Sequence, residues 1–74
     1  MTFNLSPLAQ QVLVYMRGFE NMIFDHNDFT TALQRDRLEI DAALRELESS
    51  GYVRRIEYGG LTEPMVTEWQ LIDR

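Results

Sequence analysis

The chain has 74 residues, of which 45% are hydrophobic, and it contains no cysteine. A chain this short supplies one hydrophobic core, so we expect a single domain over residues 1–74. The lack of cysteine excludes disulfides and thiolate metal sites and is typical of a cytoplasmic protein. Twelve carboxylates against seven arginines, with no lysine, give a net charge of −5. Nucleic-acid binding would therefore require the cations to share one face.

The start of a first helix is indicated by Ser6 and Pro7, because serine caps helices and proline is tolerated at the first helical position. Gly18 predicts where this helix ends. From residue 8 to residue 19, apolar residues recur at helical spacing: Leu8, Val12, Leu13, Met16 and Phe19.

The next segment is short, and three kinds of local pattern follow one another in it. Residues 22–24 are apolar and typical of a small strand, whereas residues 25–28 are polar and predict a turn that contains several possible helix caps. His26, the chain's one histidine, is expected to have a turn or cap role there. A second, short helix is predicted to run through Phe29, Ala32 and Leu33.

A third helix is predicted over residues 36–49. Asp36 is suited to cap it, and Glu39 follows at the spacing of a capping box. Gly51 is placed to take the left-handed conformation after its end. One inward stripe is formed by Ile40, Ala43, Leu44 and Leu47.

The hydrophobic period changes from 3.6 to 2 after Gly51, which predicts a β-hairpin. Its strands are expected at residues 52–58 and 65–72, joined by a loop at 59–64 that is rich in turn residues. One face of the second strand carries Met65, Thr67, Trp69 and Leu71. We expect a shared core of Leu13, Met16, Ile40, Leu44, Leu47, Trp69 and Leu71.

One run of residues resembles the winged helix-turn-helix family, and MarR-like and related small bacterial regulators in particular. The run comprises Ala32-Leu33, Asp36, Ile40, Ala43-Leu44, Leu47-Glu48 and Gly51-Tyr52-Val53. The resemblance implies an α+β winged helix in the order α-β-α-α-β-β, with a three-helix core, a short strand and a C-terminal hairpin wing. It implies that residues 36–49 are a recognition helix and residues 59–64 the wing tip. It also implies a small DNA-binding transcriptional regulator.

Four arginines are candidates to contact duplex DNA: Arg37, Arg45, Arg54 and Arg55. Several features oppose this hypothesis. Five carboxylates accompany two arginines between residues 36 and 48, and the wing tip has no cation and is flanked by Glu57, Glu63 and Glu68. Asp41 stands four residues from both Arg37 and Arg45 and can pair with either. Arg54 and Arg55 can equally be solvated strand residues that pair with nearby carboxylates.

The alternative hypothesis is a protein–protein interaction module that uses the acidic third helix and the wing. Leu38 and Ala42 share the outward stripe of that helix and can anchor a partner, or Leu38 can pack against the second helix. The candidate partner surface comprises Leu38, Glu39, Asp41, Ala42 and Leu61. A third hypothesis is mimicry of the negative surface of DNA. Formation of a homodimer would present two helices to successive DNA half-sites.

Catalysis is not indicated by any motif in the sequence. His26 lacks the partners that acid–base or metal chemistry needs. Arg35 is a departure from the family pattern, because relatives usually bury an aliphatic residue at this position of the turn. Tyr15 and Tyr58 could stack on a base or a partner, yet nothing distinguishes them from ordinary packing residues. We therefore expect no enzyme activity, cofactor, metal or small-molecule substrate. The longest apolar run, residues 12–16, is too short to cross a membrane.

Overall fold

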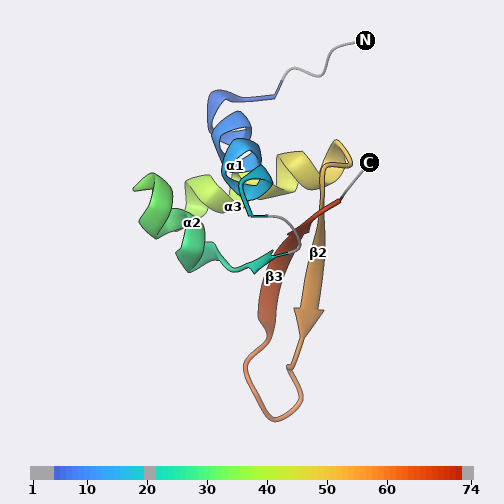
Figure 1. Cartoon of the computed structure of the whole chain (residues 1–74). Helices are drawn as coiled ribbons and strands as arrows, with labels where there is room; N and C mark the ends of the chain where they lie inside the picture. Colours follow the sequence, from blue (N-terminus) through green and yellow to red (C-terminus); the bar gives the residue numbers. More distant parts are fainter. Residues whose placement is uncertain (1–4, 20–21, 73–74) are drawn as a thin grey trace.

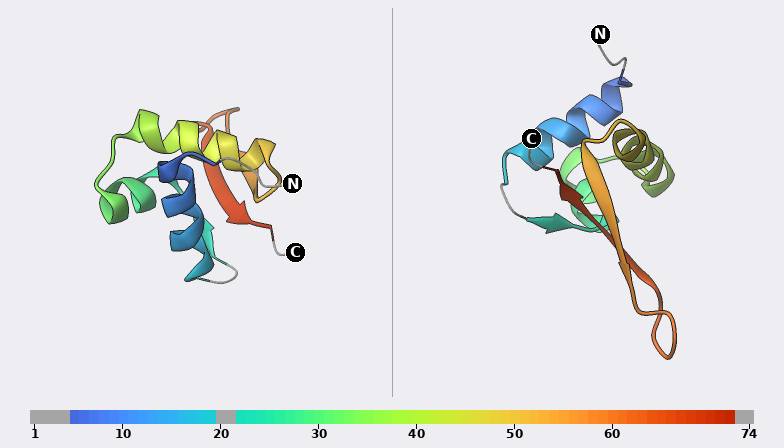
Figure 2. Two further views of the ribbon diagram at one scale, coloured as in Figure 1. Left: turned by 90° about the horizontal axis from the view of Figure 1, so that it is seen from above. Right: turned by 90° about the vertical axis from the view of Figure 1, so that its right-hand side faces the viewer.

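The computed structural model describes residues 5–19 and 22–72 of the chain. Its elements are α1 (Pro7–Arg17), β1 (Ile23–Phe24), α2 (His26–Leu33), α3 (Arg37–Ser49), β2 (Val53–Tyr58) and β3 (Val66–Leu71) (Figure 1). The strands form one antiparallel sheet in the order β1-β3-β2. The three helices gather beside one end of this sheet, and the β2–β3 hairpin projects beyond them (Figure 2). This α+β arrangement is the winged-helix fold that the sequence predicts.

The predicted starts and ends of the helices are largely confirmed at α1 and α3. The Ser6 hydroxyl accepts a hydrogen bond from the Ala9 amide at 3.2 Å, Pro7 is the first helical residue and Gly18 closes α1. Gly51 follows the end of α3 with a φ of 83°, which a glycine adopts without the steric cost of a Cβ atom.

The capping box forms at α2 instead of α3. The Asp25 carboxylate accepts from the Asp28 amide and the Asp28 carboxylate from the Asp25 amide, both at 3.0 Å. The helix cap predicted within residues 25–28 is confirmed at Asp25, whereas the turn predicted there is wrong, because α2 already begins at His26. Asp36 precedes α3 in an extended conformation, but its side chain makes no capping bond. Glu39 is held by Arg35 at 3.4 Å, which directs its carboxylate away from the box predicted with Asp36.

The core lies between the inner faces of the three helices and the sheet. Six of the seven residues predicted to share it are buried, and Leu71 is half-buried against them. Met65 precedes β3 and is 63% exposed, because this part of the hairpin extends beyond the helices and has no helix packed against it. Phe19 lies beyond the end of α1 and is also exposed. The buried apolar residues are Ala9, Val12, Leu13, Met16, Phe24, Phe29, Ile40, Ala43, Leu44, Leu47, Val53 and Trp69.

The register of the sheet is defined around Trp69, the fully buried residue of the middle strand. Trp69 stands opposite Phe24 of β1 and Arg55 of β2. Because side chains alternate along a strand, Val53, Arg55 and Glu57 share the face of the sheet that carries Trp69. Arg54, Ile56 and Tyr58 point to the opposite face, together with Ile23, Val66, Glu68 and Gln70.

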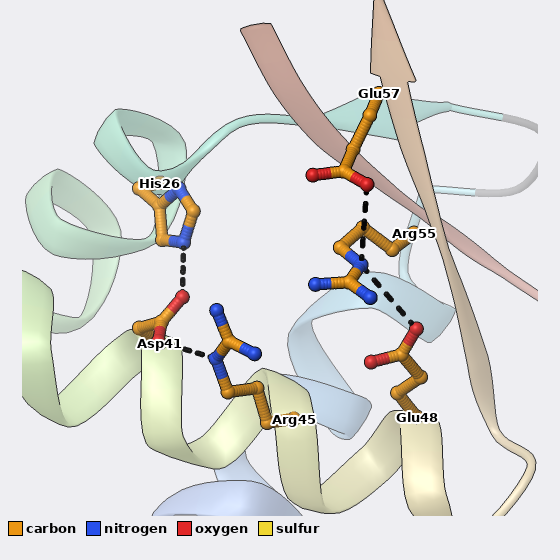
Figure 3. A network of polar contacts seen from close by, with 6 residues as sticks. All are labelled: His26, Asp41, Arg45, Glu48, Arg55 and Glu57. Atoms are coloured by element: carbon orange, nitrogen blue, oxygen red, sulfur yellow. Dashed lines mark hydrogen bonds and ion pairs between the residues drawn. The ribbon is translucent and has the colours of Figure 1, made fainter. Parts of the chain in front are cut away.

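His26 is a buried residue at the start of α2, which corrects the turn or cap role predicted for it. Its side chain is on the inner side of α2, and its ring meets the Trp69 ring edge-on at 6.0 Å. The His26 Nε2 atom lies 3.0 Å from the Asp41 carboxylate of α3 (Figure 3). A polar ring is accommodated in the core because it has this partner. The contact joins α2 to α3.

We expect Leu44→Ala to lower the free energy of unfolding by about 2–5 kcal/mol, because it leaves a cavity in the closed core. Leu38→Ala on the same helix removes the same atoms from a side chain that is 78% exposed and should change stability by no more than about 0.5 kcal/mol. Urea unfolding followed by circular dichroism measures both. Equal effects of the two substitutions would contradict the assigned inward face of α3.

We expect Asp41→Asn to lower the free energy of unfolding by about 1–3 kcal/mol at neutral pH, because two charge-assisted hydrogen bonds are weakened. The pKa of Asp41 is lowered in the folded state, so its contribution is present above the ordinary aspartate pKa of about 3.9. This contribution is lost as the pH falls through the lowered pKa.

The difference in free energy of unfolding between wild type and Asp41→Asn should therefore become smaller at acidic pH. Urea unfolding at a series of pH values measures this difference. Glu39→Gln is the matched control, since it removes one charge from an exposed pair worth about 0.3–0.5 kcal/mol. A pH-independent difference for Asp41→Asn would show that the charge of Asp41 does not support the fold.

Candidate binding surface

The outward side of α3 carries most of the residues that the sequence proposes for binding. Five of these residues are exposed: Arg37, Leu38, Glu39, Ala42 and Arg45. The Leu38 side chain stays 78% exposed, so it is not buried against α2. We call these five residues the α3 outer face. The buried stripe comprises Ile40, Ala43, Leu44 and Leu47. Leu38, Ala42 and Arg45 lie opposite this stripe, and Arg37 and Glu39 lie at its two flanks.

Asp41 joins the α3 outer face to the core. Arg45 Nε lies 2.7 Å from the Asp41 carboxylate, whose other oxygen faces His26 (Figure 3). The hydrogen bond from Arg45 is the main reason that the pKa of Asp41 is lowered; burial opposes it and the bond to His26 reinforces it. The pKa of Arg45 is raised by the same carboxylate. The alternative pair of Asp41 with Arg37 does not form among the described residues.

Arg54 and Arg55 are adjacent in sequence but point to opposite faces of the sheet. Arg54 donates from Nε to the side-chain oxygen of Gln70 at 2.8 Å, a neutral partner that leaves the arginine charge uncompensated. Arg55 lies on the helix side of the sheet. The two arginines therefore do not form the single cationic patch that their adjacency suggests.

Two carboxylates bracket Arg55 on the helix side of the sheet. Arg55 Nε lies 3.5 Å from Glu48 of α3 and 4.0 Å from Glu57, two residues further along β2 (Figure 3). The Glu57 contact has a sequence signal, because residues two apart in a strand share a face. The Glu48 contact has none, since it depends on how α3 packs against β2. These two carboxylates were not among the residues that the sequence proposed for binding.

The acidity of α3 is compensated in part, because arginines pair with three of the five carboxylates between residues 36 and 48. Four of the five carboxylates between residues 36 and 48 have a partner within the described residues. The Asp36 carboxylate is the fifth, and it makes neither a capping hydrogen bond nor an ion pair there. Glu46 accepts a hydrogen bond from the Ser6 amide at 2.7 Å and so ties α3 to the start of α1. The other three pairs are Glu39 with Arg35, Asp41 with Arg45 and Glu48 with Arg55. The helix therefore presents less free negative charge than its composition indicates.

The wing tip lies far from α3, at the outer end of the hairpin (Figure 1). Gly59 and Gly60 have φ values of 89° and 95°, and the Gly60 amide closes the loop by donating to the Glu63 carbonyl at 2.8 Å. A Cβ atom at Gly59 would stand 2.6 Å from the Pro64 carbonyl oxygen, so this turn requires glycine. Leu61 is fully exposed and is separated from Leu38, so the predicted partner surface divides into two places.

The described part of the chain contains neither a cluster of metal-binding side chains nor a membrane-spanning helix. Within residues 5–19 and 22–72, His, Asp and Glu side chains do not gather in threes where they could hold a metal ion. The helices described there are all too short or too polar to span a bilayer.

Comparisons with known proteins give one informative likeness. No protein-family model matches the chain, and no curated protein matches its sequence. Among solved structures, a chain named as a possible transcriptional regulator of Methanosarcina mazei Go1 is similar, with a TM-score of 0.84 over 96% of this chain and 13% sequence identity. This chain spans 59% of the length of that one. At this identity the likeness establishes a winged-helix fold shared with a chain of that name, while a specific MarR-like relationship stays a prediction.

Proposed function

We propose that this chain is a non-enzymatic winged-helix module that binds duplex DNA within a transcriptional regulator. The fold shared with the possible regulator of Methanosarcina mazei supports the regulatory role. The exposed α3 outer face supports the mode of binding, because the recognition helix of this fold class enters the major groove. The observation that carries the proposal is Arg37, an exposed cation at the start of α3 that forms no ion pair among the described residues.

Arg45 is a second candidate contact on the same face. Its recorded bond to Asp41 uses Nε, which leaves the terminal nitrogens of the guanidinium group available to a phosphate. Arg54 also retains its charge but lies on the other face of the sheet, and Arg55 is compensated by two carboxylates. The proposal therefore rests on Arg37 and Arg45.

Self-association belongs to this proposal. One copy offers two α3 cations to the phosphates, which is few for a duplex-binding protein. Two copies related by a two-fold axis would present two α3 helices to half-sites one helical turn apart and double the number of contacts.

Protein binding is the second candidate function, and the exposure of Leu38 favours it. Leu38 is 78% exposed, with Ala42 one turn further along α3 and the charged side chains of Glu39, Asp41 and Arg45 around them. An apolar centre within a polar rim is the anatomy of a small protein interface. Three of the five α3 carboxylates pair with arginines of the same chain, which disfavours the third hypothesis, mimicry of DNA, because a mimic needs its negative charges free.

For the DNA proposal, we expect Arg37→Ala to weaken duplex binding across different sequences and to reduce the slope of log affinity against log salt by about 1, since one phosphate contact is lost. Arg17→Ala is the matched control, because Arg17 is an exposed arginine at the end of α1. Fluorescence anisotropy with labelled duplexes at several salt concentrations measures both. The proposal fails if the wild-type chain does not bind duplex DNA even at low salt.

For the protein-binding candidate, we expect Leu38→Asp to abolish capture of a partner in an affinity pull-down while the fold stays intact by circular dichroism. Val14→Asp is the matched control, since Val14 is an apolar side chain of α1 that is 68% exposed. If wild type and Leu38→Asp recover the same proteins, Leu38 is not an anchor. A variant that binds DNA normally but loses its protein partner would favour this candidate over the first.

A further inference from the structure

The outer edge of β2 is an unpaired strand edge. β2 pairs with β3 on one side, and no other described strand lies along its second side. A six-residue edge of this kind presents free N–H and C=O groups that can template pairing with another strand.

The hydrogen bonds to β3 identify which residues face this edge. The Ile72 amide donates to the Tyr52 carbonyl at 2.9 Å, so the bonded positions of the ladder alternate from Tyr52 through Arg54, Ile56 and Tyr58. Val53, Arg55 and Glu57 alternate with these residues. Their backbone N–H and C=O groups therefore point away from β3 and toward the free edge.

We propose that two copies of this chain associate through their β2 edges, antiparallel, about a two-fold axis at Ile56. The inference deepens the self-association part of the proposed function and names its surface, but it does not depend on DNA binding. We infer that the partner strand is β2 of a second copy, because the charges along this edge complement those of the same edge in antiparallel orientation.

Comparison of the symmetric registers shows this complementarity. An axis at Arg55 would place that residue opposite its own copy, and an axis at Glu57 would do the same for two carboxylates; like charges directly opposite are destabilising. An axis at Ile56 places Arg55 opposite Glu57 of the second copy, twice by symmetry. Of these three registers, only the axis at Ile56 sets opposite charges against each other.

The side chains at this register can make the new contacts beside the partners that they already have within the chain. Both recorded ion pairs of Arg55 use Nε, so its terminal nitrogens can bind Glu57 of the second copy without displacing Glu48. On the opposite face of the sheet, Ile56 would meet Ile56 of the second copy. Arg54 would lie beside the exposed ring of Tyr58 of the second copy, an arrangement that favours a cation–π contact.

Light scattering coupled to size-exclusion chromatography, without DNA, tests the proposal. We expect wild type to have the mass of two copies at high concentration. Arg55→Glu and Glu57→Arg should each have the mass of one copy, because each substitution sets like charges opposite one another. A one-to-one mixture of these two variants should regain the mass of two copies, because both cross-strand pairs again join opposite charges.

Two controls keep the result specific. Arg35→Glu changes the same charge at an exposed ion pair outside β2 and should leave the dimer intact. Circular dichroism establishes that each variant is folded. Since no DNA is present, the outcome is independent of whether the DNA proposal holds.

Hydrogen exchange on the wild-type chain provides a second measurement that needs no variant. The amides of Arg55 and Glu57 should exchange more slowly as protein concentration rises, whereas the Arg35 amide should not change. The proposal is overturned if wild type stays a single copy at every concentration. It is equally overturned if a dimer forms without protection of these two amides, or if folded charge variants do not recover on mixing.

Discussion

Trp69 lies fully buried in the middle strand, against the helices, and its register with Phe24 and Arg55 determines which side chains face the core and which face solvent. A shift of one residue in either ladder would turn Trp69 toward solvent and bring polar side chains inward. Burial of a large aromatic side chain makes such a shift costly. The same register determines that Arg55, and not Arg54, lies on the face of the sheet that carries Trp69.

Features that depend on neighbouring residues could be predicted from the sequence. Ser6 and Pro7 act within one helical turn, and the buried stripe of α3 is readable because helical periodicity determines which side chains share a face. The capping box shows the limit of this reasoning. Asp25 with Asp28 and Asp36 with Glu39 have the same spacing, yet the reciprocal hydrogen bonds form only at the first pair, and Glu39 pairs with Arg35.

The polar contacts that position the candidate surface were harder to predict, because their partners are distant in the chain. His26 and Asp41 are 15 residues apart, and Arg55 reaches Glu48 only because β2 returns beside the end of α3. A signal for His26 was nevertheless present: it precedes Phe29 and Leu33 at helical spacing, which predicts an inward-facing position. The polarity of residues 25–28 concealed that pattern, since a polar run is more often a turn.

The arginines divide between the two proposed interactions according to the element that carries them. Arg37 and Arg45 stand on α3 and are not part of the β2 edge, so pairing of two edges leaves both available to phosphate groups. Arg55 already lies between two carboxylates, which makes it a poor phosphate contact but a suitable partner for a third carboxylate, because its terminal nitrogens remain open. A chain with a net charge of −5 can therefore use one arginine on β2 to join two copies. Under the DNA proposal, the cations on the α3 helices of the two copies would then act together on one duplex.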